Sequence, residues 1–213
     1  MQRDLILRDV RKALGRYQGE AIPPPPPARI VIPEVPVSQR IDSMLERVVA
    51  LAGKTLRARS MAEARDYVAG LIQGKTAVAS NAPFLRECGI TELPGVRSGI
   101  ADRDELRGLC ATCHYGITSA DFGLSDTGSL VMISSREEAR LVSLLPPAHI
   151  AVLPASKLLT GLDELFNILP HPAEQTSSMV LITGPSRTAD IEQILVRGVH
   201  GPGEIHVVVV EGV

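Results

Sequence analysis

Short apolar runs recur along this chain, and segments with helical periodicity lie between most of them. Each run is four or five residues long, and several are rich in β-branched side chains, which is typical of strands buried on both faces of a sheet. This alternation predicts an α/β fold with a mostly parallel sheet covered by helices. The runs are residues 76–79, 130–133, 149–153, 179–183 and 207–210.

The first residues of the chain carry a different pattern. Residues 1–15 mix Arg, Lys and Asp with an apolar face that includes Ile6, Val10 and Leu14. This spacing predicts a charged amphipathic helix that ends at Gly15. A secretory signal peptide would instead contain an uninterrupted apolar stretch, so the pattern indicates a cytoplasmic protein. The presence of three cysteines, which cannot all pair, also fits a reducing compartment.

Five consecutive prolines, residues 23–27, follow this helix. They predict a stiff polyproline II spacer, and a ligand for a proline-binding module is the alternative. We therefore divide the chain into an N-terminal amphipathic helix with a proline-rich spacer, residues 1–27, and an α/β domain, residues 28–213. The helix is then available to a partner protein or to a second copy of the chain, as in a homo-oligomer.

Composition excludes two classes of partner. The net charge is −2 and the sequence pI is about 6.2, so the chain has no general attraction to nucleic acid or anionic membranes. Only 3% of residues are aromatic and there is no Trp, which argues against base stacking on nucleic acids. No apolar run approaches the roughly 20 residues that a membrane span needs. We therefore expect no nucleic-acid partner and no membrane span.

A polar turn, residues 125–129, precedes the second apolar run. Asp126 supplies a carboxylate, and Gly128 can adopt positive φ or let another group approach closely. Such a turn can hold an anion on its backbone N–H groups, although the same residue types also form ordinary turns. The candidate ligand-binding residues here are Thr127, Gly128 and Ser129.

A second candidate site follows the apolar run at residues 179–183. The predicted helix over residues 189–197 would begin just after this loop, and helix N-termini at the ends of strands bind anions. Arg187 adds a planar cation suited to a carboxylate or phosphate. The alternative is an ordinary capped helix in which Thr188 is the N-cap and Arg187 pairs with Asp190. The candidate ligand-binding residues are Gly184, Ser186, Arg187 and Thr188.

A third candidate loop, residues 198–203, carries His200 between glycines. Such a histidine can approach a ligand closely, and Gly201 is a further candidate ligand-binding residue. The alternative is a tight loop with a solvated histidine. Asp126 and His200 are the only catalytic acid–base pair that the sequence suggests. His149 and His206 begin predicted strands, and we expect both to be structural.

Residues Cys110, Cys113 and His114 match the C-x-x-C-H pattern of haem attachment. Covalent haem attachment requires export, which the N-terminal sequence does not indicate. A metal site would need further ligands, and the chain has no second cysteine pair and no iron–sulfur spacing. We therefore expect no metal and no cofactor on this chain, and two small reduced cysteines beside a strand.

Four longer motifs resemble the LUD-domain family, and the match covers roughly residue 75 to the C-terminus. The resemblance implies a fold similar to the NagB/RpiA/CoA-transferase group. It also implies a place in bacterial oxidation of L-lactate to pyruvate, together with two partner proteins of which one or both carry iron–sulfur clusters. The motifs are GLSDTGS (123–129), SLLPPAH (143–149), ITGPSRTADIE (182–192) and GVHGP (198–202).

Two functional hypotheses remain open. In the first, the chain is an accessory subunit of a lactate-oxidising complex that binds a small anion such as lactate at its glycine-rich loops, while its partners carry the iron–sulfur clusters. In the second, it is an independent enzyme on a phosphorylated or CoA-linked metabolite, with Asp126 and His200 as acid and base. The missing redox motifs favour the first hypothesis.

Overall fold

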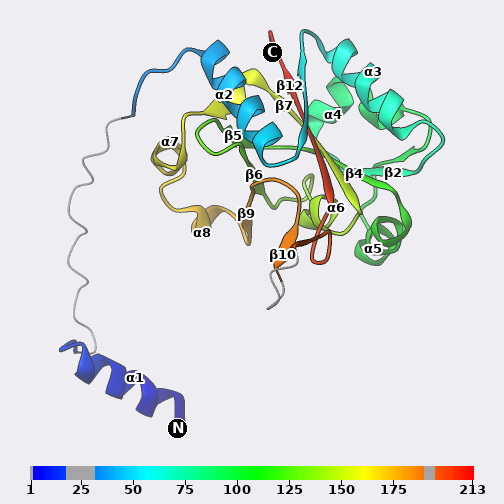
Figure 1. Ribbon diagram of the computed structural model, residues 1–213. Helices are drawn as coiled ribbons and strands as arrows, with labels where there is room; N and C mark the ends of the chain where they lie inside the picture. Colours follow the sequence, from blue (N-terminus) through cyan, green and yellow to red (C-terminus); the bar gives the residue numbers. More distant parts are fainter. Residues whose placement is uncertain (1, 18–31, 190–194) are drawn as a thin grey trace. The chain divides into compact units, whose positions relative to one another are not determined.

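The computed structural model describes residues 2–17, 32–189 and 195–213 (Figure 1). The chain divides into two units, residues 1–31 and 32–213. The first unit contains helix α1 (Gln2–Ala13), whose side chains are largely exposed. A helix thus lies where the sequence predicts an amphipathic helix. The proline run and the boundary placed after residue 27 lie outside the described residues.

A six-stranded sheet forms the centre of the second unit. Its strand order is β1-β12-β7-β4-β2-β3, and every neighbouring pair is parallel. Three of the five predicted strands lie here, which confirms the predicted α/β fold with a mostly parallel sheet. The strands are β1 (Lys54–Ala58), β2 (Ala77–Ala79), β3 (Val96–Arg97), β4 (Tyr115–Ser119), β7 (Ala148–Pro154) and β12 (Glu204–Val210).

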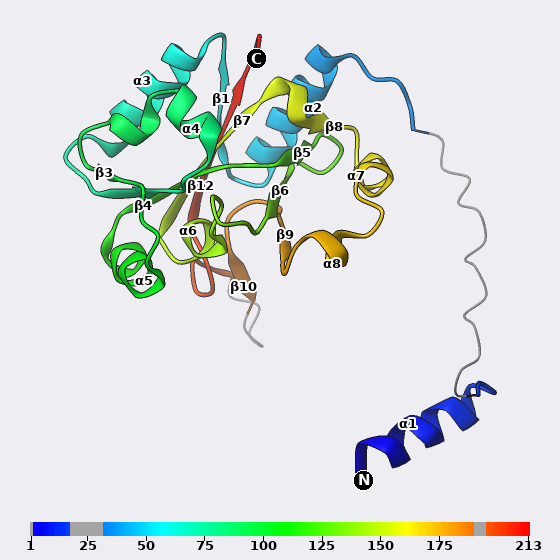
Figure 2. The ribbon, with the colours of Figure 1, turned by 180° about the vertical axis from the view of Figure 1, so that it is seen from behind.

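The central sheet is buried on both faces because successive side chains of its strands point to opposite sides. Ile150 and Val208 face a cluster with helices α3 (Met61–Ile72) and α4 (Pro83–Glu87). Leu153 and Val209 face a cluster with helix α2 (Val37–Ala50) and the second sheet. Helices α5 (Arg103–Thr112) and α6 (Arg140–Leu144) pack over β2 and β4 (Figure 2). Both faces are therefore closed to water.

The other two predicted strands belong to a second, mixed sheet with the order β8-β5-β6-β9. Its strands β6 and β9 are antiparallel, whereas β5 and β8 are parallel. The sheet packs its inner side chains against α2 and the central sheet. The remaining elements are β5 (Phe122–Leu124), β6 (Ser129–Ile133), β8 (Leu158–Leu159), α7 (Leu162–Ile168), α8 (Pro172–Gln175), β9 (Met179–Ile182) and the 3₁₀ turns η1 (Ile90–Glu92) and η2 (Ala155–Lys157).

The prediction of a helix over residues 189–197 is wrong at both ends of this segment, where the chain forms strands. Strands β10 (Arg187–Ala189) and β11 (Leu195–Arg197) pair with each other in antiparallel orientation. The hairpin is closed at its base because Gly198 N donates to Ser186 O at 3.0 Å and Ser186 N donates to Pro202 O at 2.8 Å. These bonds hold the loop around Ser186 against the loop at residues 198–202. The apolar periodicity of residues 189–197 does not reveal this contact.

Local signals near helix ends are reproduced in part. Ser60 Oγ accepts from Glu63 N, and Asp102 Oδ1 accepts from the first N–H groups of α5, as the capping patterns indicate. No side chain of the described residues caps α4, and the nearby Asn81 side chain instead bridges Gly99 N and Ile100 O in a neighbouring loop. No helix in the described part of the chain is long and apolar enough to cross a membrane.

Candidate functional site

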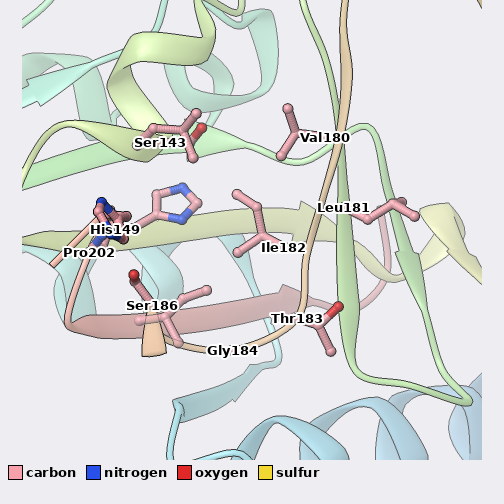
Figure 3. A pocket seen from close by; sticks show the side chains of 13 residues that line it. Ser143, His149, Val180, Leu181, Ile182, Thr183, Gly184, Ser186 and Pro202 are labelled. Carbon is pink, nitrogen blue, oxygen red and sulfur yellow. The ribbon is translucent and has the colours of Figure 1, made fainter. Parts of the chain in front are cut away.

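A cavity of about 200 Å³ lies where strands β7 and β12 begin, beside strand β9 (Figure 3). Three of the four sequence motifs contribute residues to its wall. Apolar side chains of β9, Val180 and Ile182, form one part of the wall. The polar lining residues are Ser143, His149, Thr183, Ser186 and His200.

His149 is the buried polar group of this cavity. Its side chain is 1% exposed, and its Nε2 lies 2.7 Å from Thr118 Oγ1 on the neighbouring strand. Burial, followed by the proximity of His206, lowers the pKa of His149 to about 3, so the ring stays neutral at physiological pH. Its Nδ1 has no hydrogen-bond partner among the residues that the structure describes. A buried ring nitrogen without a partner, facing a cavity, is available to a ligand.

The sequence predicts a structural role for His149, and so this residue was missed as a site candidate. The available signal was its position one residue after the SLLPPA stretch, at the start of a buried strand. A polar side chain at the edge of a sheet points into whatever space the adjoining loops leave. Only the fold shows that the loops at residues 184–186 and 200–202 adjoin this edge.

Four of the predicted ligand-binding or catalytic residues lie in this cavity wall: Gly184, Ser186, His200 and Gly201. Ser186 Oγ and the exposed His200 side chain make no hydrogen bond within residues 32–189 and 195–213. Gly184 has φ +84° and packs against Leu51 at the end of α2. The two loops thus place the hydroxyl of Ser186 and the imidazole of His200 in the wall of the cavity that His149 also lines.

The turn at residues 125–129 contacts this site through hydroxyl groups. Ser129 Oγ lies 2.7 Å from Thr183 Oγ1, which lines the cavity, and 2.9 Å from Thr127 Oγ1. Gly128 has φ +70°, as a turn glycine would, and a β-carbon there would lie 3.0 Å from Val48 N of α2. The close approach at this glycine is therefore made by α2.

Three backbone N–H groups of this turn already have acceptors. The N–H of Ser125 donates to Leu159 O, that of Asp126 to Thr160 O, and that of Gly128 to Leu124 O, at 2.9 to 3.0 Å. These groups would have to leave their partners to hold an anion. In this geometry the turn contacts the cavity only indirectly, through the hydrogen bond between Ser129 Oγ and Thr183 Oγ1.

Asp126 and His200 occupy different places. Asp126 is exposed beside α7, where a β-carbon at Gly161 would lie 2.5 Å from Asp126 Oδ2. Asp126 is absent from the cavity wall, whereas His200 lines it. No hydrogen bond joins the two side chains in the described structure.

Arg187 extends from β10 to the end of α2, where its Nη2 donates to Leu51 O. A guanidinium at the C-terminal end of a helix interacts favourably with the free carbonyl groups and the helix dipole. Thr188 is paired with Val196 in the β10–β11 hairpin. Neither residue lines the 200 Å³ cavity.

The cysteines lie in the apolar core. Cys110 and Cys113 pack with Val78 and Val142, and both are buried and free of disulfide bonds. Burial raises the pKa of the Cys110 thiol to about 11, so it is not a thiolate at neutral pH. His114 points elsewhere, with Nδ1 3.0 Å from Thr76 Oγ1. Within the described residues, no three His, Cys, Asp or Glu side chains group as metal ligands would.

Comparison with known proteins identifies relatives along the whole chain. The sequence profile described as the LUD domain matches residues 41–210. A protein named lactate utilization protein C from Halalkalibacterium halodurans is 30% identical, over 99% of this chain and 98% of that one. A protein of the same name from Shouchella clausii is also 30% identical, over 98% and 97% of the two chains.

A solved structure shares the fold. The crystal structure of a DUF162 family protein from Deinococcus radiodurans, at 1.70 Å resolution, superposes with a TM-score of 0.64. The alignment covers 83% of this chain and 99% of that one, at 17% sequence identity. This likeness supports the α/β architecture described above.

Proposed function

Because the chain belongs to the LUD-domain family, we propose that it serves lactate utilization by binding a small carboxylate, L-lactate, in the cavity beside His149. The observation that carries this proposal is the convergence of three family motifs on one cavity, with the fourth motif bonded to its wall through Ser129 and Thr183.

The chemistry of the cavity suits a small hydroxy acid. Among the described residues, no acidic side chain lines it, so those residues present no negative charge to an entering carboxylate. If Thr118 donates its hydroxyl proton to Nε2 of His149, then Nδ1 carries the ring proton and can donate to a carboxylate oxygen. Ser186 offers a second donor. The apolar side chains of β9 can contact the methyl group, and about 200 Å³ accommodates a molecule of six heavy atoms.

This chain is an accessory subunit in the proposal. Oxidation of lactate to pyruvate removes two electrons, and an iron–sulfur cluster needs about four thiolate ligands. The three cysteines of this chain do not fit that requirement, and the two in the C-x-x-C pattern are buried in an apolar core. The resemblance to the LUD-domain family implies that partner proteins carry the clusters, and the cysteines of this chain fit that proposal. Co-purification of the tagged full chain with iron–sulfur proteins tests this part of the proposal.

The first prediction is that L-lactate binds the full chain and that His149→Leu or Ser186→Ala weakens this binding about 10- to 100-fold, the worth of a hydrogen bond to a charged group. Calorimetric titration of each folded variant measures the loss. His171→Leu is the matched control, because His171 is exposed and lies outside the cavity. Equal lactate affinity in wild type, His149→Leu, Ser186→Ala and His171→Leu would show that the carboxylate does not bind in this cavity.

The second prediction concerns Arg187, which the sequence assigned to the ligand. Arg187 donates to Leu51 O at the end of α2, so Arg187→Ala should lower the melting temperature slightly and leave lactate affinity unchanged. The same titration, with a thermal melt, measures both quantities. A large loss of affinity at constant stability would instead place Arg187 on the ligand, together with Thr188, and would move the site to the β10–β11 hairpin.

The alternative function, an independent enzyme on a phosphorylated or CoA-linked metabolite, requires Asp126 and His200 to act on one substrate. Its test is turnover of such substrates by the purified chain alone. Loss of that turnover in both Asp126→Asn and His200→Gln would favour the alternative over an accessory role.

A further inference from the structure

A second and larger cavity, of about 570 Å³, lies at the carboxyl ends of strands β4 and β7. Strand β4 ends at Ser119 and β7 at Pro154, and both residues line it. None of its lining residues lines the cavity at His149. In open α/β folds, ligands bind outside the carboxyl ends of parallel strands. The position therefore suits a ligand site that the four family motifs do not mark.

Glu138 is the buried polar side chain of this second cavity. It is 6% exposed, and its Oε2 accepts from Ser80 Oγ at 2.8 Å and from Ser119 N at 3.3 Å. Its other oxygen, Oε1, is buried and has no partner in the described part of the chain. An unpartnered carboxyl oxygen of a buried residue costs free energy unless a ligand or a proton compensates it.

The charges around the cavity are mostly negative. Four acidic side chains line it and one basic side chain, Lys157, faces them. Asp121 is held in place because its Oδ2 accepts from Ile133 N at 2.6 Å. Lys157 Nζ lies 5.5 Å from the ring centre of Phe122, so a cation already rests on one aromatic wall of this cavity. The other acidic residues are Glu87 and Glu137 at the rim and Glu138 inside.

We propose that this second cavity is a separate binding site for a small organic ammonium compound. The ammonium group would sit between Glu138 Oε1 and Asp121, with the aromatic rings of Phe84 and Phe122 beside its carbon skeleton. A carboxylate such as lactate would meet four acidic side chains here. The two cavities therefore select ligands of opposite charge.

Binding of a cation here is coupled to a proton on Glu138. Burial is the main cause that raises the pKa of Glu138 to about 8, and the charge of Asp121 adds to it. An ammonium ion beside Oε1 stabilises the carboxylate, so binding at pH 7 releases a proton. The other charged groups facing Glu138 are Asp121 and Glu137 on its own side of the cavity, Glu87 of α4 and Lys157 after β7.

Three probes that share a carbon skeleton and differ in charge test the proposal: 1-aminopropan-2-ol, propane-1,2-diol and L-lactate. Titration of the full isotope-labelled chain, followed by amide chemical shifts, locates each one. We expect the amino alcohol to move the amides of Ser119, Asp121 and Glu138, and the other two probes to leave them in place. Movement of these amides by the diol or by lactate to the same extent overturns the charge selectivity, and no movement with the amino alcohol overturns the site.

The proton linkage gives a second readout. Affinity for the amino alcohol should rise by up to about tenfold per pH unit below pH 8 and then level off. In Glu138→Gln the affinity should fall and its pH dependence should disappear. Glu137→Gln, a change of the same kind at the exposed neighbour, should keep the pH dependence. An unchanged pH profile in Glu138→Gln overturns the role of Glu138.

Lactate binding at His149 is independent of this result. If lactate moves the amides of Ser186 and Gly201 while the amino alcohol moves nothing, the proposed function stands and the second site falls. If only the amino alcohol moves amides at the carboxyl ends of the strands, the second site stands alone.

Discussion

Replacing Gly116 with alanine should destabilise the protein strongly, although the change adds only one methyl group. Gly116 is the second residue of β4, which lies between β7 and β2, and its backbone faces helix α6. A β-carbon at this position would lie 1.9 Å from Val142 O and 2.9 Å from Pro146 Cγ. Because Val142 O is a backbone atom of α6, no side-chain rotation relieves the overlap, and the helix itself must move.

We expect Gly116→Ala to lower the free energy of unfolding by at least about 3 kcal/mol, at the upper end of the usual cost of overpacking. For a unit of this size the melting temperature should fall by roughly 6–12 °C. Helix α6 also carries Ser143 and Leu144, which line the first cavity. Lactate affinity should therefore fall with stability, and both are measured by thermal melts and titration.

Gly70 supplies the control for this substitution. It lies in helix α3, is exposed, and has no atom within 4 Å of an added β-carbon. Gly70→Ala should stabilise the helix by roughly 0.5–1 kcal/mol, because alanine loses less backbone freedom than glycine. A Gly116→Ala protein as stable as wild type would show that α6 is not packed tightly against β4.

The strands could be predicted from the sequence because burial on both faces leaves a strong signal. Residues 149–153 and 207–210 have no polar alternation, and both are central strands. The same signal does not say which sheet a strand joins. Residues 130–133 and 179–182 look no different in sequence, yet they form the second, mixed sheet. Partner choice depends on long-range contacts that a local window does not contain.

The β10–β11 hairpin shows where local periodicity fails. Apolar residues at 191, 194 and 195 have helical spacing, but Arg187 to Ala189 pair with Leu195 to Arg197 instead. The bonds from Ser186 and Gly198 that close the hairpin join positions at least twelve residues apart. Helical spacing is a weak signal over a segment of this length, and tertiary contacts override it.

The site could be predicted in part. The sequence identified the loops at residues 184–186 and 200–201 as ligand candidates, and both line the first cavity. It did not identify His149 or Glu138, because nothing in a sequence distinguishes a buried polar group with a free atom from one that is fully bonded. Both residues became candidates only when the partners of each buried atom were known.

The last prediction uses Glu138 to separate burial from charge. The pKa of Glu138 is raised from 4.5 to about 8 in the folded protein, chiefly by burial. Between these two values the unfolded chain has released the proton and the folded chain still holds it. Stability therefore decreases as pH rises from 4.5, and the loss is complete above about pH 8.

Glutamine at position 138 has the same shape and no charge at any pH. It can accept the hydrogen bonds from Ser80 and Ser119 through its carbonyl oxygen. At pH 5, wild type and Glu138→Gln should therefore unfold with free energies within about 1 kcal/mol of each other. At pH 9 the variant should be more stable by roughly 2–4 kcal/mol, because only the wild type must then bury a carboxylate.

Denaturant unfolding at a series of pH values measures this difference, and subtracting the two curves cancels the titration of all other groups. Glu137→Gln is the matched control: Glu137 is the exposed neighbour, and its curve should run parallel to that of wild type. A constant difference between wild type and Glu138→Gln from pH 5 to pH 9 would mean that Glu138 is ionised throughout. The free Oε1 atom would then carry a charge already balanced within the protein, and the second cavity would lose its reason to bind a cation.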